Sequence, residues 1–123
     1  MPELPEVETL CRQLQQTIGG RKIKASVVYD PKLNGIPEIR GSSIKDVRRS
    51  GKSIMIHLDD GRSIAIHLRM TGRLLLNQQE TRLPHTRWRL SLASEHVDLV
   101  DPRRFATVKI NTTDMDPRQN DLI

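Results

Sequence analysis

Residues 53–68, SIMIHLDDGRSIAIHL, decide the fold class of this chain. Apolar residues occupy every second position on both sides of a central DDG, namely Ile54, Ile56, Leu58, Ile64, Ile66 and Leu68. Alternation with a period of two is typical of strands that bury one face, and Gly61 relieves the backbone strain of a tight turn. The stretch therefore predicts an antiparallel β-hairpin.

Short apolar runs of the same kind lie on both sides of this hairpin, at 23–27, 73–77, 86–93, 97–100 and 106–110. The N-terminal segment differs, because Val7, Leu10, Leu14 and Ile18 recur at helical spacing before Gly19-Gly20 ends the helix. We therefore expect a mainly β chain with an N-terminal α-helix and about eight short strands, arranged as an antiparallel sandwich or a barrel.

The length of 123 residues is that of one domain. The polar tail that follows residue 112 predicts a linker or a domain boundary at 113–123. No apolar run approaches membrane-spanning length and no signal-peptide pattern is present, so we expect a cytoplasmic protein. Cys11 is the only cysteine, which excludes an internal disulfide and a multi-cysteine zinc site, and its place on the apolar helix face predicts a core residue.

The charge balance is basic, with 20 Lys plus Arg against 15 Asp plus Glu and a net charge of +5. Such an excess favours a polyanionic partner, because neutralising phosphates releases their counterions. Charge alone is equally compatible with a basic domain that binds no nucleic acid.

The first ten residues, MPELPEVETL, hold two prolines and three acids. A helix start accounts for Pro5, Glu6 and Glu8, but not for Pro2 and Glu3, which precede the helical pattern. Removal of the initiator methionine would expose Pro2 as an α-amino nucleophile, which titrates near pH ~8 and can form a Schiff base. Glu3 could then transfer protons. The alternative is that Pro2 is only a second residue common after methionine.

Three loops hold unusual residues: RRSGKS at 48–53, HLRMTGR at 67–73 and DPRRFA at 101–106. Lys52 is either a phosphate ligand or proton carrier, or an ordinary solvated lysine. The glycine spacing before it is not that of a P-loop. The dispersed histidines, His67 and His85 among them, do not form a metal-ligand set, and the phase of His67 within its strand favours a structural role.

Met70 and Phe105 both stand among arginines, in polar loops. Apolar wedges of this kind are inserted between bases by proteins that kink DNA, and an enzyme that flips a base must fill the gap it leaves. An arginine with forked donors suits the orphaned partner base. A core position remains the alternative for Phe105.

These segments follow one another in an order and spacing that resemble the formamidopyrimidine-DNA glycosylase and endonuclease VIII (Fpg/Nei) family. The resemblance rests on MPELPEVETL, GRKI, PKL, RRSGKSIMIHL, IHLRMTGRLL, PHTRW and DPRRFA, and runs from Met1 to about Ile110. The opening decapeptide and DPRRF are closer to the glycosylase branch. The resemblance implies an N-terminal catalytic domain at 1–112, built as a two-layer β-sandwich with the first helix packed on it.

The resemblance also assigns chemistry to individual residues. Pro2 would attack the sugar C1′ of an oxidised purine nucleotide, such as 8-oxoguanine or a formamidopyrimidine, and form a Schiff base. Glu3 would be the acid that helps to open the sugar ring and expel the base, and Glu6 would support the damaged-base site. Lys52 would assist β-elimination and hold a backbone phosphate.

A second set of residues would contact the DNA around the lesion. By the same resemblance, Met70, Arg103 and Phe105 would fill the gap left by the everted nucleotide, with Arg103 facing the estranged cytosine. His85 and Arg104 would hold phosphates. The expected partner is therefore damaged double-stranded DNA, at a bacterial-type, nucleoid-associated location and without a membrane.

The sequence departs from the family pattern at several points. Arg69 and Ala106 stand where glycine is usual, and Arg87 stands where a second histidine follows His85. The family's helix–two-turns–helix module and zinc finger have no counterpart here, so we expect no cofactor in this chain. We infer a truncated chain, a split product or a degenerate paralogue, and expect half of a cleft to bind DNA weakly.

The function that the sequence predicts is that of a DNA repair glycosylase and abasic-site lyase domain for oxidised purines, inactive alone if the second half is essential. A non-catalytic DNA-binding or lesion-sensing module on the same scaffold is the alternative. A lesser expectation is an interaction domain, in which the uncovered cleft face drives self-association or binds the missing half.

Overall fold

The structure is a computed structural model that describes residues 3–112. The predicted nucleophile Pro2 and the predicted linker at 113–123 lie outside the described residues. The element order is α1 (Leu4–Ile18), β1 (Ala25–Val28), the short 3₁₀ helix η1 (Pro31–Leu33), β2 (Ile44–Ser50), β3 (Ser53–Leu58), β4 (Arg62–His67), β5 (Arg73–Asn77), β6 (Thr86–Ser91), β7 (His96–Val100) and β8 (Thr107–Thr112).

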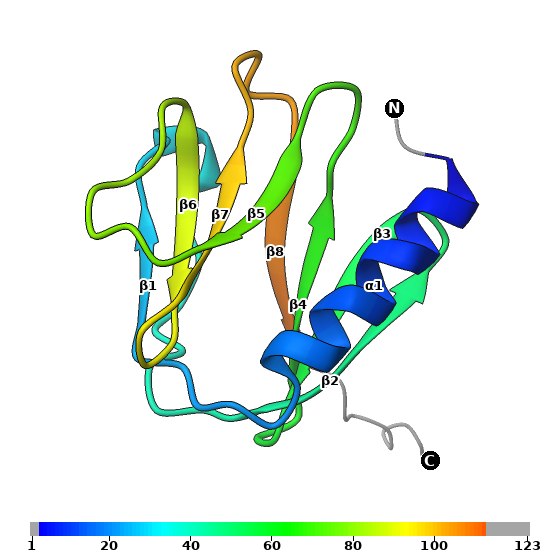
Figure 1. The fold of residues 1–123 in the computed structure, drawn as a ribbon, viewed down its shortest axis with the longest axis vertical. Helices are drawn as coiled ribbons and strands as arrows, with labels where there is room; N and C mark the ends of the chain where they lie inside the picture. The colour runs from blue at the N-terminus through cyan, green and yellow to red at the C-terminus, as the bar shows by residue number, and fades with distance from the viewer. Residues whose placement is uncertain (1–2, 113–123) are drawn as a thin grey trace.

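Two four-stranded antiparallel sheets form the body, with the strand orders β1-β6-β7-β5 and β2-β3-β4-β8. The layers face each other and α1 lies along the second sheet, against β2 and β3 (Figure 1). The predicted mainly β fold, a two-layer sandwich with an N-terminal helix, is confirmed. The alternative of a barrel is wrong, because the two sheets remain separate.

The predicted hairpin is β3 and β4, in which Ile54 pairs with Ile66 and Ile56 with Ile64. All four side chains are fully buried. Their inward face meets the other sheet, whose largest buried side chain is Trp88. Burying one face of each strand is what gives the alternating pattern of the sequence.

Helix α1 begins at a capping arrangement and ends at glycine. The Glu3 N–H donates to the Glu6 carboxylate at 2.7 Å, which satisfies one of the exposed donors of the first turn. The helix buries its apolar face, including Cys11, which is 2% exposed and confirms the core prediction. The chain then turns at Gly19 and at Gly20, whose φ is +80°.

Strand β2 corrects the prediction of a loop at 48–53. Arg48, Arg49 and Ser50 belong to the strand, and only Gly51 and Lys52 form the turn into β3. The pairing with β3 shifts between Ile44 and Asp46, so that the buried Ile44 and Val47 are three residues apart. Because this irregularity breaks the period of two, the segment has no alternating pattern.

A buried ion pair fastens the long connection from β5 to β6. Arg89 on β6 donates to both carboxylate oxygens of Asp98 on β7, at 2.6 and 2.9 Å. The same guanidinium donates to the carbonyl of Glu80 at 2.8 Å. Burial alone would raise the pKa of Asp98, but hydrogen bonds from Arg89 and Asn77 bring it below its ordinary value. The connection that leads to His85 is therefore held from inside the sheet.

Candidate nucleic-acid interface and active site

The loop from β7 to β8 is built around the carboxylate of Asp101, which is fully buried. One oxygen accepts the N–H groups of Phe105 and Ala106, each at 2.8 Å, and the other accepts the N–H of Arg103 at 3.1 Å. Burial alone would raise the pKa of Asp101, but these bonds and one from Thr71 lower it below its ordinary value. An ionised carboxylate therefore organises the turn.

The turn leaves its two predicted DNA contacts accessible. Phe105 is 38% exposed, and the guanidinium of Arg103 lies 4.9 Å from the centre of its ring. The core alternative for Phe105 therefore does not hold, since the ring is only partly covered. Its exposed face and the neighbouring cation form one surface.

The loop from β4 to β5 meets this turn. The Thr71 hydroxyl donates to Asp101, and a Cβ added to Gly72 would lie 2.9 Å from that of Ala106. Met70, next to Thr71, is 66% exposed, the most exposed of the large apolar side chains in the described part of the chain. The structure thus brings the loop of Met70 against the loop of Arg103 and Phe105.

These two loops lie at one end of the sandwich, the end at which α1 begins (Figure 1). Glu3 and Glu6, both exposed, stand at that helix start, where Glu6 accepts the Glu3 N–H. The capping contact gives Glu6 a structural role besides the predicted one. The predicted nucleophile Pro2 directly precedes Glu3 in the chain.

Lys52 occupies the turn between β2 and β3, beside Gly51, whose φ is +59°. The side chain is half-buried, and its residue precedes Ser53, which pairs with His67. Burial, followed by the charges of Arg69 and Lys52, lowers the pKa of His67. The predicted lysine therefore lies near the strand end that leads into the Met70 loop.

His85 and Arg104 also reach the turn at 101–106, but in different ways. The carbonyl of His85, whose φ is +64°, accepts the N–H of Asp101 at 3.1 Å. Arg104 turns toward η1, where its guanidinium donates to both oxygens of the buried Asp30 at 2.9 and 3.1 Å. The hydrogen bond from Arg104 is the main cause that lowers the pKa of Asp30. Arg104 is thus partly engaged within the protein.

Residues 1–108 match the family described as Formamidopyrimidine-DNA glycosylase N-terminal domain. The chain belongs to this family. It is 34% identical over 122 residues to the formamidopyrimidine-DNA glycosylase (Fpg) of Desulfitobacterium hafniense, covering 93% of this chain and 45% of that relative. With the Fpg of Acidiphilium cryptum it shares 38% identity over 122 residues, covering 92% of this chain and 43% of the relative.

Solved structures agree with these relatives. A complex of a Lactococcus lactis Fpg variant with DNA containing Fapy-dG superposes with a TM-score of 0.84 at 30% identity, covering 91% of this chain and 44% of that one. A complex of the same organism's Fpg with abasic-site DNA gives a TM-score of 0.84 at 28% identity, with coverages of 91% and 45%. This Fpg-family chain therefore spans less than half the length of the relatives that it matches.

The three residues that depart from the family pattern each make a local contact. Arg69, at φ +57°, donates its backbone N–H to Nδ1 of His67 at 3.0 Å, so His67 makes a contact with the strained backbone of this loop. Arg87 donates to the carbonyl of Asp101 at 2.8 Å. The methyl group of Ala106 is buried against Gly72. The loops accommodate all three residues.

Sequence reasoning missed the roles of Asp101, Thr71 and Asp30. The sequence places Asp101 in the DPRRFA loop without a role of its own, although an aspartate before proline can accept backbone N–H groups within its own loop. Asp30 carries the same signal, since it also precedes a proline and accepts the N–H of Lys32 at 3.0 Å. Nothing local pointed to Thr71.

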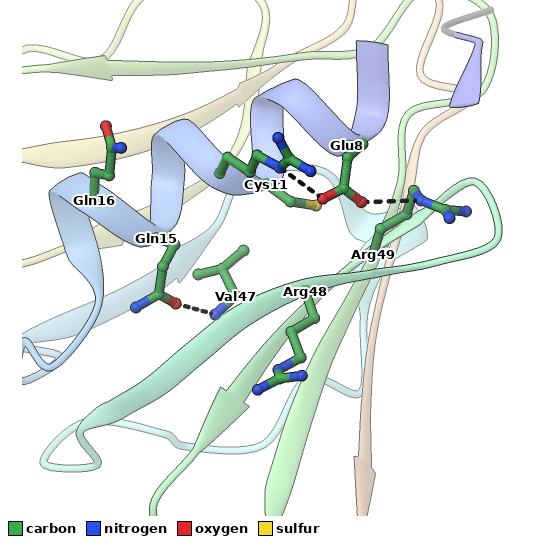
Figure 2. Close-up of a pocket in the computed structure, with 8 residues that line it drawn as sticks. Glu8, Cys11, Gln15, Gln16, Val47, Arg48 and Arg49 are labelled. Carbon is green, nitrogen blue, oxygen red and sulfur yellow. Dashed lines mark hydrogen bonds and ion pairs between the residues drawn. The ribbon is translucent and has the colours of Figure 1, made fainter. Parts of the chain in front are cut away.

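A groove of about 450 Å³ lies between α1 and β2 (Figure 2), and no residue of the Met70 or Phe105 loops lines it. Its lining includes Glu8, Arg12, Gln15 and Arg49, and the Gln15 amide oxygen accepts the N–H of Val47 at 2.7 Å. Because β2 is an edge strand, this bond satisfies a donor that has no strand partner. None of the predicted site residues lines the groove.

Two features of the described residues concern the metal and membrane predictions. Within residues 3–112, no group of three or more His, Cys, Asp and Glu side chains could hold a metal ion. In the same part of the chain, no helix is both long and apolar enough to cross a membrane.

Proposed function

We propose that this chain is the catalytic half of a DNA glycosylase with abasic-site lyase activity, acting on oxidised purines in double-stranded DNA. The observation that carries the proposal is the joining of two loops by Asp101, which presents Met70, Arg103 and Phe105 at the end where α1 begins. The substrate class, 8-oxoguanine and formamidopyrimidine nucleotides, follows from the family.

The exposed loops suit the eversion of a nucleotide. Met70 and Phe105 supply apolar surface that can occupy the gap in the base stack, and the forked donors of Arg103 can bond to the estranged base. Their backbone is fixed by buried bonds to Asp101, so the wedge need not be ordered at the moment of binding. His85 and the exposed part of Arg104 supply phosphate contacts at the same turn.

The chemistry begins at the chain end. The amine of Pro2 forms a bond to the sugar C1′, the glycosidic bond breaks, and the base leaves with the bonding electrons and a proton. Glu3 supplies the proton that helps to open the sugar ring, which leaves a Schiff base. In β-elimination a proton then leaves C2′ and the 3′ phosphate departs, and Lys52 assists as proton carrier and phosphate ligand.

Borohydride trapping tests this activity, because reduction makes the Schiff base a stable covalent bond. The chain, with its initiator methionine removed, is expected to form a covalent complex with abasic-site DNA. The complex should be lost in Pro2→Gly and in protein that retains the methionine. A chain that gives no covalent complex at any concentration would contradict the proposed activity.

A non-catalytic DNA-binding or lesion-sensing module is the second candidate, favoured by the exposed arginines of the turn at 101–106, Arg103 and Arg104, which can contact DNA without any chemical step. It predicts salt-dependent binding to duplex DNA without trapping, reduced by Arg103→Ala and Arg104→Ala because phosphate and base contacts are lost. Titrations at several salt concentrations measure this. If Pro2→Gly weakened DNA binding as much as the two arginine substitutions do, this result would argue against the non-catalytic module. A mass measurement in solution tests self-association.

A further inference from the structure

The groove between α1 and β2 contains a chain of polar contacts that reaches the Lys52 turn. One carboxylate oxygen of Glu8 on α1 accepts from Nε of Arg12 at 3.0 Å, and the other accepts from Nε of Arg49 on β2 at 3.2 Å (Figure 2). The Nη1 of Arg49 donates to the carbonyl of Gly51 at 3.0 Å. Arg49 therefore bonds the helix with one end of its guanidinium and the turn with the other.

This double contact restricts the turn more than a simple ion pair would. The guanidinium is planar and its donors have fixed relative directions, so two bonds define both distance and orientation. The side chains of Arg49 and Glu8 are 33% and 40% exposed, so the value of the contact lies in geometry more than in stability. Hydrogen bonds from Arg12 and then Arg49 lower the pKa of Glu8 below its ordinary value.

The two parts that Arg49 connects are those that carry the proposed chemistry. Helix α1 begins directly after Glu3, and the turn holds Lys52 next to Gly51. We propose that Arg49, held by Glu8, is a positioning residue that fixes the Lys52 turn against the start of α1 and so places the Lys52 ammonium for β-elimination. This inference rests on the proposed function, because it assigns Arg49 a part in the lyase step.

The groove supplies its own control residue. Arg12 binds the same carboxylate as Arg49, but its side chain is 76% exposed and its contact with Glu8 lies within α1. Arg12→Ala therefore removes an equal charge and an equal ion pair with Glu8 while leaving the Arg49–Gly51 bond in place. Any difference in turn exchange or strand cleavage between Arg49→Ala and Arg12→Ala therefore reports the effect of the Arg49–Gly51 bond.

The first measurement is hydrogen exchange of the backbone amides at 50–53, in the whole chain without DNA. In Arg49→Ala we expect exchange there to become at least about threefold faster, because the turn loses its tie to the helix. Arg12→Ala should leave it unchanged. Arg49→Lys should resemble Arg49→Ala, since a single ammonium lacks the fork. Thermal melting confirms that each variant is folded.

The second measurement separates the two chemical steps on abasic-site DNA. We expect Arg49→Ala to slow strand cleavage by about tenfold through misplacement of Lys52, while borohydride trapping changes by less than about twofold. Arg12→Ala should change neither. A general structural defect would reduce both rates together, so the ratio of cleavage to trapping is the decisive quantity.

Two results would overturn the inference: exchange at 50–53 no faster in Arg49→Ala than in Arg12→Ala, or cleavage and trapping that change in parallel. If the unchanged chain traps no DNA at all, the proposed function fails. The exchange measurement still decides then whether Arg49 holds the turn, so the two failures are distinguishable.

Discussion

At the scale of single residues, one buried carboxylate controls most of the candidate interface. Asp101 accepts backbone N–H groups from Arg103, Phe105 and Ala106, and a hydroxyl from Thr71. Replacing a buried acceptor that serves several donors lowers the stability of the fold, because each donor left unpaired in the interior loses its hydrogen bond without regaining one to water. Asp101 is not itself one of the predicted DNA contacts. Its hydrogen bonds determine the conformation of the two loops that carry the predicted contacts Met70, Arg103 and Phe105.

Asp101→Asn is expected to destabilise the fold by about 1–3 kcal/mol, since an amide nitrogen would face N–H groups that now donate to an oxygen. Urea unfolding measures the loss. The pKa of Asp101 is lowered in the fold, so its stabilisation is present above its ordinary pKa and is lost as the pH falls through the folded value. The difference in the free energy of unfolding between the unchanged protein and Asp101→Asn should therefore become smaller in acid.

Asp46→Asn is the matched control, because one of its carboxylate oxygens is buried without any hydrogen bond. We expect Asp46→Asn to lower the free energy of unfolding by less than Asp101→Asn does. Two results would contradict the role given to the Asp101 carboxylate. One is an equal loss of unfolding free energy in Asp101→Asn and Asp46→Asn, and the other is a stability difference for Asp101→Asn that grows in acid.

At the scale of elements, polar bonds between neighbouring segments hold the loops. The Arg89–Asp98 pair joins β6 to β7 and also holds the carbonyl of Glu80, in the connection before His85. The Arg104–Asp30 pair joins the turn at 101–106 to η1 in the same manner. The hydrogen bonds of these pairs have fixed directions, so they help to define where the connected segments lie.

Arg89→Met is expected to destabilise the protein by about 3–5 kcal/mol, because Asp98 is then buried without its partner. Adding Asp98→Val should recover part of this loss, since no uncompensated charge remains. Urea unfolding of the three proteins measures the effect. Amides at 78–85 should exchange faster in both variants, because neither restores the donor to Glu80. A double variant less stable than Arg89→Met would contradict this account.

The strand that the sequence did not predict is also explained at this scale. The irregular pairing near Lys45 places Ile44 and Val47 three residues apart, which removes the alternating pattern. The arginines of β2 then resemble a polar loop. One of them, Arg49, proves to connect the helix and the Lys52 turn.

At the scale of the whole molecule, a basic sandwich presents its predicted site residues mainly at one end. The net charge of +5 and the exposed arginines favour DNA, whereas acids such as Glu8, Asp30 and Asp98 are paired with arginines inside or across elements. The chain spans less than half the length of its Fpg relatives.

The sequence by itself determined the mainly β class, the N-terminal helix, the central hairpin and the family resemblance, which implied a sandwich where the residue patterns left a barrel open. Period-two and helical patterns record burial within short segments, and motifs such as DPRRFA are contiguous, so both can be read along the chain. Only the tertiary structure decided that Thr71 meets Asp101, that Arg104 turns to Asp30 and that Arg49 ties Gly51 to Glu8. The bonds of Thr71 with Asp101, Arg104 with Asp30 and Arg49 with Glu8 join side chains 30, 74 and 41 residues apart, and their partners become definite only when the sheets pack and bring these segments together.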